Sequence, residues 1–203
     1  MRRPDNPSTN RAPGGLDAIA DSAKEAGAKG LPPIHLWNPP DCGDIPMRIA
    51  ADGIWHYQNS PIGRQPLVRL FASVLKCEGD RHVLVTPVEK CGIQVDDAPF
   101  IAVEMDTKGG AKGQELRFRT NMDDWVTCGP DNMLRFEREE PAGGLKPYLY
   151  VRHGLWAKLS RALFYELVAL GEERDVDGRA MFGVASQGCF FAMAPAETLR
   201  DLA

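Results

Sequence analysis

The sequence Asp52-Gly53-Ile54-Trp55-His56-Tyr57 is followed by an apolar helical pattern over 67–75. Later in the chain, His153-Gly154-Leu155-Trp156-Ala157-Lys158 is followed by a second helical pattern over 163–170, and a strand-like run comes after each helix. This recurrence of turn, tryptophan, helix and strand indicates duplication of one supersecondary unit. We therefore expect two related units packed side by side, with a seam of the kind in which pockets preferentially form.

The segments around the two repeats predict short antiparallel strands and few helices. The first helix has Pro66 in its first turn, Gly79 after its end and apolar residues at helical spacing, namely Leu67, Leu70, Phe71, Val74 and Leu75. The second helix has Ser160 as its N-cap and Gly171 as its stop. Strand patterns cover 81–88, 100–105, 115–121, 133–137, 148–153 and 155–159, and hairpin turns are expected at Asp52-Gly53, 109–113, Asp177-Gly178 and Gln187-Gly188. The predicted class is α+β, with an α/β roll-like unit first and a mostly antiparallel β unit with one packing helix second.

The chain divides into three expected parts: a disordered tail over 1–15, an N-terminal α+β domain over 16–89 and a C-terminal, mainly β domain over 90–203. The tail contains almost nothing apolar, so burial cannot repay the entropy of ordering it. A short helix is expected over 16–29. The prolines of 31–40 exclude a helix and predict an extended segment that packs Ile34, Leu36 and Trp37 across a surface.

Composition narrows the class of protein. The chain has 203 residues, 43% hydrophobic and 26% charged, which suits one large core or two small ones. A net charge of -4 offers no general attraction to nucleic acid. No apolar stretch of signal-peptide type follows Met1, and none reaches membrane-spanning length, so we expect a cytoplasmic protein.

Cysteine and histidine spacing argues against a metal site or a cofactor. The five cysteines include no C-x-x-C pair, and the four histidines are widely scattered. The run 183–188 lacks the G-x-S-x-G spacing of a nucleophile elbow. With no catalytic motif, we do not expect an enzyme. A nucleophilic pair of Cys42 or Cys91 with a histidine stays open, because proximity in space cannot be read from the sequence.

One group of basic residues suits an anion. Arg117, Arg119 and Asn121 share a strand face, Arg135 lies on a nearby strand, and Arg64 and Lys90 flank the first repeat. Guanidinium groups bind phosphates and carboxylates bidentately. The alternative is a solvated sheet face, on which these residues pair with Glu115, Glu137 and Glu139.

The tryptophans divide in the same way. Trp55 and Trp156 hold equivalent repeat positions and are expected in the core. Trp37 and Trp125 lie in irregular polar segments and are better candidates for stacking on a ligand.

Several runs resemble a bacterial family known only as domain of unknown function twelve eighty-five. They are 31–40 with Cys42-Gly43-Asp44, Pro61-Ile62-Gly63-Arg64, 84–90 and Arg117-Phe118-Arg119-Thr120-Asn121, and the likeness covers 16–193. The resemblance implies a duplicated architecture, an α+β roll followed by a mostly β domain superficially similar to pleckstrin-homology folds. It also implies a ligand site at the interface, for a nucleotide-like molecule in signalling. It supplies no activity, and fold likeness alone carries no function.

The leading hypothesis is a cytoplasmic binding module in which a small anionic, nucleotide-like ligand settles between the units. Arg64, Lys90, Arg119 and Asn121 would hold the ligand and Trp37 would stack on it. The alternative is a protein-interaction adaptor that uses the Pro-rich segment or a strand edge. An unrecognised hydrolase would need a cysteine or histidine with a shifted pKa at the base of a pocket.

Overall fold

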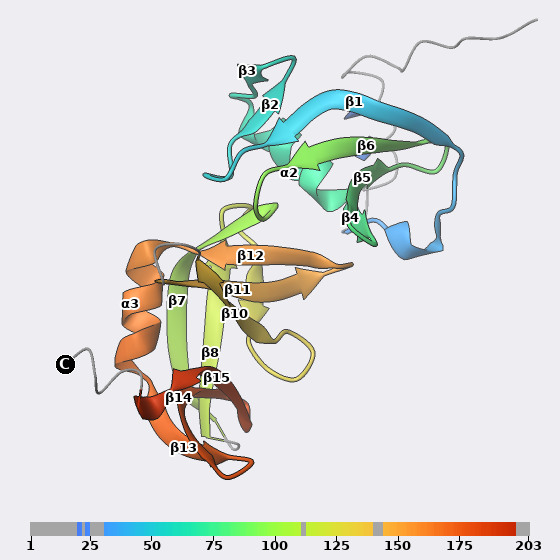
Figure 1. The fold of residues 1–203 in the computed structure, drawn as a ribbon. Coiled ribbons are helices and arrows are strands. Elements are labelled where there is room, and N and C mark those ends of the chain that lie inside the picture. The colour runs from blue at the N-terminus through green and yellow to red at the C-terminus, as the bar shows by residue number, and fades with distance from the viewer. Residues whose placement is uncertain (1–19, 22, 25–30, 111–112, 140–143, 198–203) are drawn as a thin grey trace, which may run out of the picture.

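The computed structural model describes residues 20–21, 23–24, 31–110, 113–139 and 144–197 as two units that lie against each other (Figure 1). The expected tail over 1–15 and most of the expected helix over 16–29 lie outside the described residues. Ala20 and Ala23, which were expected on one helix face, are described and buried. The buried apolar residues of both units form one connected cluster, so the units share a continuous core.

The first unit consists of one curled sheet and one helix. Its strands run in the order β3-β2-β1-β6-β5-β4, and only β1 and β6 are parallel. Its elements are η1 (Ile34–Leu36), β1 (Asp41–Ile49), β2 (Trp55–Tyr57), β3 (Ser60–Pro61), α2 (Gln65–Ser73), β4 (Leu75–Glu78), β5 (Arg81–Val85) and β6 (Lys90–Val95). The periodic residues Leu67 and Phe71 of α2 are buried, and Phe71 stacks on Trp55 at 6.3 Å between ring centroids. Thus the predicted apolar face of this helix does form the core.

The second unit has a larger sheet, a three-stranded sheet and one helix. The larger sheet runs β10-β11-β12-β7-β8-β9, with β12 and β7 parallel, and the smaller runs β13-β14-β15. The elements are β7 (Phe100–Gly110), β8 (Gly113–Thr120), β9 (Trp125–Thr127), β10 (Leu134–Glu139), β11 (Gly144–Arg152), β12 (Leu155–Leu159), α3 (Arg161–Ala169), β13 (Glu172–Val176), β14 (Arg179–Ser186) and β15 (Cys189–Pro195). The Ser160 side chain accepts from the Leu163 N–H, which confirms the predicted N-cap.

The two units repeat the same order of elements. A hairpin, a helix and a three-strand meander occur as β1-β2, α2 and β4-β5-β6, and again as β11-β12, α3 and β13-β14-β15. In the first unit the meander joins the hairpin sheet through β6, whereas in the second it forms a separate sheet. The predicted α+β class with two related, roll-like units is confirmed.

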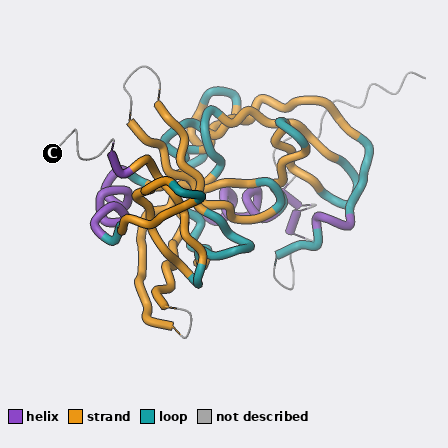
Figure 2. Tube along the Cα trace, turned by 60° about the horizontal axis from the view of Figure 1, so that its bottom comes forward, coloured by secondary structure: helices purple, strands orange, loops and turns teal. Residues whose placement is uncertain are grey.

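The helices take different places in this arrangement. Helix α2 lies towards the second unit, while α3 lies on the outer side of the second unit against β7 and β14 (Figures 1 and 2). The first unit meets the second through α2 and through β4, which is an edge strand of its sheet.

Several local predictions were wrong for identifiable reasons. The segment 31–40 is not wholly extended, because Ile34–Leu36 forms a turn of 3-10 helix that buries Ile34 and leaves Leu36 72% exposed. Helix α2 ends at Ser73, and Leu75 already belongs to β4. The strand expected over 81–88 stops at Val85, where a turn containing Pro87 follows. Strand β6 was not predicted, and it extends the first sheet to Val95, beyond the domain boundary expected at 89/90.

Candidate functional site

Two hydrogen bonds cross the seam between the units near the tip of the β11-β12 hairpin. The Cys77 N–H on β4 donates to the carbonyl oxygen of His153 at 2.9 Å, and Arg152 Nη2 donates to the carbonyl oxygen of Ala72 at 3.3 Å. His153 and Gly154 both have positive φ, at 49° and 77°, which is the backbone of a two-residue hairpin turn. This tight turn lets the tip of the β11-β12 hairpin reach β4 of the other unit.

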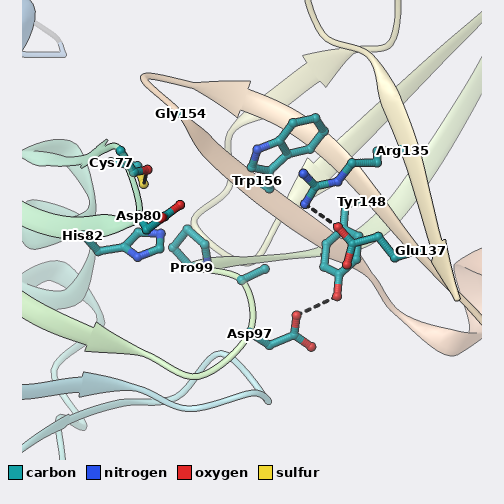
Figure 3. Close-up of a pocket in the computed structure, with 12 residues that line it drawn as sticks. Cys77, Asp80, His82, Asp97, Pro99, Arg135, Glu137, Tyr148, Gly154 and Trp156 are labelled. Atoms are coloured by element: carbon teal, nitrogen blue, oxygen red, sulfur yellow. Dashed lines mark hydrogen bonds and ion pairs between the residues drawn. The ribbon is translucent and has the colours of Figure 1, made fainter. Parts of the chain in front are cut away.

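A cavity of about 330 Å³ opens beside this contact (Figure 3). Residues of both units and of the segment that joins them line it: Cys77, Gly79, Asp80, His82, Asp97, Ala98, Pro99, Arg135, Glu137, Tyr148, Gly154 and Trp156. The seam between the two units, where the duplication predicts a pocket, therefore contains a cavity.

The wall from the second unit is aromatic and basic. The Arg135 guanidinium lies 4.2 Å from the centroid of the Trp156 ring and 5.3 Å from that of Tyr148. Arg135 Nη2 also pairs with Glu137 Oε1 at 2.9 Å (Figure 3). Arg135 and Tyr148 meet because they are direct cross-strand neighbours on β10 and β11. Trp156 lies on the next strand, β12, where its direct neighbour on β11 is Tyr150. The result is a stacked cation and ring facing the first unit.

The floor of the cavity is an ordered network around Asp97. Its carboxylate accepts hydrogen bonds from Tyr148 Oη at 2.7 Å and from Lys158 Nζ at 2.6 Å. Burial opposes ionisation of Asp97, but the hydrogen bonds from Lys158 and Tyr148 outweigh it and lower its pKa. Burial and the same hydrogen bond to Asp97 raise the pKa of Tyr148, so this phenol remains protonated and donating at neutral pH.

The wall from the first unit comes from the β4-β5 hairpin. Asp80 and His82 point towards the cavity from this side (Figure 3). Burial lowers the pKa of His82, which keeps its imidazole neutral at pH 7. Cys77 Sγ donates to the carbonyl oxygen of Gly79 at 3.1 Å, and burial, followed by the charge of Asp80, raises the pKa of this thiol. An activated thiol nucleophile has the opposite shift of its pKa.

The lining side chains carry more negative than positive charge. Asp80, Asp97 and Glu137 are carboxylates, and Arg135 is the one Arg or Lys among the lining residues. Asp97 is held by Lys158 and Glu137 by Arg135, whereas the described contacts give Asp80 no ion pair. The cavity thus offers an aromatic face and one cation on one side and a hydrogen-bond acceptor on the other.

Of the seven residues predicted from the sequence to bind a ligand, only Arg135 lines this cavity. Arg119 Nε and Nη1 bond Glu104 at 2.6 Å and Asp123 at 2.8 Å. The Arg117 guanidinium lies 5.1 Å from the Trp125 ring centroid. Arg119 is therefore paired with two carboxylates, although not with the glutamates named in the alternative to an anion cradle, and Arg117 lies over a ring.

The other four predicted residues lie elsewhere. Lys90 Nζ pairs with Glu78 Oε2 at 2.8 Å, and Arg64 is the exposed residue that precedes α2. Asn121 Oδ1 accepts from the Ile101 N–H at 3.0 Å, and Trp37 packs against the core beside η1. The structure does not bring these side chains together around one cavity.

The sequence prediction missed most of the cavity. Trp156 was expected in the core, yet it is only partly buried and lines the cavity, while Trp55 is 1% exposed. Asp80, His82, Asp97 and Tyr148 carried no motif. The available signal was the His153-Gly154 pair, because a two-residue turn makes Leu155 the partner of Arg152 and places Trp156 on the opposite face of the strand from Leu155.

Comparison with known proteins identifies the family. The model of the N-terminal domain of unknown function DUF1285 matches residues 32–98, and that of the C-terminal domain of the same family matches residues 99–193. The chain belongs to the DUF1285 family. This is the family twelve eighty-five that the sequence resembles. The two DUF1285 models meet between Ala98 and Pro99, both of which line the cavity.

Two solved structures of DUF1285 proteins are similar to the chain. The crystal structure of a DUF1285 protein from Silicibacter pomeroyi DSS-3 is 46% identical, with a TM-score of 0.83 over 93% of this chain and 100% of that one. A DUF1285 protein from Shewanella baltica OS155 is 29% identical, with a TM-score of 0.50 over 62% of this chain and 91% of that one. No curated protein matched. In the part of the chain that the structure describes, no helix is long and apolar enough to cross a membrane.

Proposed function

We propose that this DUF1285 chain is a binding module that holds a small planar ligand in the seam cavity. The observation that carries the proposal is the placement of Trp156 and Arg135 on one wall and Asp80 and His82 on the facing wall. A volume of about 330 Å³ is at the lower end of the range typical of ligand sites, which suits one ring system with few substituents.

Charge in the cavity refines the expected ligand. The ring of Trp156 offers a face on which a heteroaromatic ring can stack, which supports a nucleotide-like ligand. Arg135 is already shared with Glu137 and is the one Arg or Lys in the lining, so it gives weak support to a multiply charged phosphate. Asp80 instead accepts hydrogen bonds from ligand N–H groups. A base or nucleoside with an exocyclic amino group therefore fits better than a polyphosphate.

The proposed role in signalling follows from where the ligand sits. Because the two walls belong to different units, a ligand that contacts both stabilises one relative packing of the units over others. Ligand binding then changes the relative packing of the two units, and this change is the signal. No chemical step on the ligand is needed.

The test is a thermal-shift titration with matched ligands. Adenosine and inosine differ at the amino group that would meet Asp80, and adenosine monophosphate adds the phosphate that would meet Arg135. A ligand at about 100 times its dissociation constant adds about 2.7 kcal/mol to the native state. We expect adenosine to raise the melting temperature more than inosine, and the added phosphate to increase the shift little.

Variants separate this cavity from the basic residues predicted from the sequence. Trp156→Leu, Asp80→Asn and Arg135→Met should each reduce the shift, whereas Arg64→Met and Arg119→Met should not. A shift lost in the Arg64 and Arg119 variants and retained in the cavity variants would overturn the proposal in favour of the sequence-predicted cradle. No shift with any of the three compounds would reject an amino-bearing nucleoside as the ligand.

A second candidate is the protein-interaction adaptor, which one observation favours. Leu31 and Leu36 of the Pro-rich segment are 60% and 72% exposed. Extended proline-containing segments serve as ligands for partner grooves. If the chain is an adaptor, a photo-cross-linker at position 36 should capture one defined partner protein. The double variant Leu31→Ser/Leu36→Ser should no longer bind that partner. A cross-linker at the exposed position 64 should not capture it.

A further inference from the structure

Three potential metal ligands meet in the first unit, and none of them lines the seam cavity. Cys42 lies on β1, Cys91 on β6, and Glu89 in the turn before β6. The two Sγ atoms and a carboxylate oxygen all lie within 4.8 Å of one another, and Cys42 Sγ is 3.4 Å from Glu89 Oε2. The spacing of the cysteines in the sequence gives no sign of this cluster.

The parallel pairing of β1 with β6 brings the two cysteines together. Asp41 pairs with Lys90, and the Lys90 N–H donates to the carbonyl oxygen of Pro40 at 3.0 Å, so Cys42 and Cys91 are the next neighbours along the two strands. The register then shifts before Asp44 pairs with Gly92, at a bulge that contains Gly43 with φ +82°. The shift falls in the interval that contains Cys42 and Gly43, and the two Sγ atoms still lie within 4.8 Å of each other.

Glu89 is held in place by a turn of its own backbone. The Thr86 N–H donates to the carbonyl oxygen of Glu89 at 2.9 Å, and the Glu89 N–H donates to Thr86 Oγ1 at 3.2 Å. Thr86 is 1% exposed, so this turn is anchored in the interior. The backbone of Glu89, the third ligand, is therefore fixed before an ion binds. Supporting contacts of this kind orient the ligands of metal sites.

The donor set selects a class of cation. Two thiol sulfurs and one carboxylate oxygen suit Zn²⁺, which takes sulfur ligands at about 2.3 Å and carboxylate oxygen at about 2.0–2.2 Å. Ligand atoms around such a tetrahedral ion lie about 3.4–3.8 Å apart, which the cluster reaches by small side-chain rotations. Cys91 is buried and Cys42 is exposed, so the fourth position of the tetrahedron faces solvent.

We propose that Cys42, Glu89 and Cys91 bind one Zn²⁺ ion per chain, with water as the fourth ligand. The ion joins β1, β6 and the turn between β5 and β6. The positive charge of the ion offsets the repulsion between the two thiolates and the carboxylate, which otherwise makes it harder for all three to be ionised at once. This site does not depend on ligand binding in the seam cavity.

The test is a zinc titration of the chelator-treated, reduced 203-residue chain against a chromophoric zinc chelator. We expect one site per chain. Loss of a supporting outer-shell contact weakens metal sites by about 10–100-fold, so Cys42→Ser and Cys91→Ser, which each remove a direct ligand, should weaken binding by at least about 100-fold. Glu89→Gln should weaken it less. The matched control variants Cys77→Ser and Cys189→Ser should bind as the parent does.

Cobalt substitution gives a second readout that reports the ligands themselves. Co²⁺ bound to the parent should show thiolate-to-cobalt charge-transfer absorption, which should be reduced in Cys42→Ser and retained in Cys77→Ser. Cys42 is exposed, so its variant keeps the fold even if replacement of the buried Cys91 does not. Zinc affinity unchanged in Cys42→Ser and Glu89→Gln, or a Cys42–Cys91 disulfide that forms equally with saturating zinc present, would overturn the proposal.

Discussion

The carbonyl oxygen of His153 accepts a hydrogen bond from the Cys77 N–H at 2.9 Å, and this bond links a hairpin tip of one unit to a strand of the other. The adjacent Gly154 fits against the same residue, because a Cβ placed on it would lie 3.0 Å from Cys77 Cβ and 3.2 Å from the Cys77 carbonyl oxygen. The two units are therefore in backbone contact at the mouth of the cavity, where a single methyl group changes their separation.

Gly154→Ala should destabilise the protein more than the same change in a turn that faces solvent. Alanine at φ +77° costs about 1–2 kcal/mol from backbone strain, and the contact with Cys77 adds to it. Gly178→Ala is the matched control, since Gly178 has φ +79° in an equivalent hairpin turn with nothing within 4 Å of its Cβ position. Urea unfolding of the two variants gives the difference, and equal losses would contradict a tight seam.

Asp97 should make the folded state sensitive to acid. Its pKa is lower when folded than in the unfolded chain, where it is about 3.9, so its stabilising contribution is complete above that value and is lost as the pH falls through the folded pKa. Lys158→Met removes a donor and should move this loss to higher pH. Asp97→Asn should remove it. Both effects are measured as free energies of unfolding between pH 7 and pH 3, and parallel profiles for the three proteins would argue against the network.

Tyr148→Phe should weaken the same network without removing a charge. The phenol donates to the Asp97 carboxylate at 2.7 Å, and a hydrogen bond to a charged group contributes about 1.5–3 kcal/mol. Because Lys158 still holds Asp97, we expect a loss at the lower end of that range. Tyr165→Phe removes a hydroxyl from a residue that is 59% exposed and should change stability by less than about 0.5 kcal/mol. Equilibrium unfolding of both variants is the check.

Ser186→Ala should loosen the small sheet from the larger one. Ser186 is fully buried, donates to the carbonyl oxygen of Cys128 at 2.7 Å and accepts from the Leu116 N–H at 2.9 Å. Its loss leaves both backbone groups unpaired, for an expected cost of about 2–3 kcal/mol. Ser73→Ala, which removes a hydrogen bond to Leu70 within helix α2, should cost about 0.5–1.5 kcal/mol. Faster amide exchange at Leu116 in Ser186→Ala alone would confirm the local cause.

Local features were predictable from the sequence because neighbouring residues determine them. The spacing of Leu67 and Phe71 predicts the buried face of α2, and Ser160 predicts the start of α3. Both depend on contacts within a few residues. The hairpin turns at Asp177-Gly178 and Gln187-Gly188 were predictable for the same reason, since their backbone needs positive φ.

The candidate sites depend on pairing between distant strands, which no local pattern specifies. The ion pair of Arg119 with Glu104 could not be predicted, because Glu104 is on another strand. Cys42 and Cys91 meet only through the parallel pairing of β1 with β6, and β6 itself was not predicted. Parallel pairing leaves no turn between the strands as a signal.

The two hairpin turns differ in length, and this difference decides what each copy of the repeated tryptophan does. Residues 50–54 connect Ile49 to its partner Trp55, whereas only His153 and Gly154 connect Arg152 to its partner Leu155. The first tryptophan of the pair is thereby directed inwards and the second outwards, as the exposed Ile54 and the buried Leu155 also show. After duplication, a difference in loop length accompanies the placement of one tryptophan in the core and of the other at the wall of the seam cavity, although both copies keep the same Gly-x-Trp pattern.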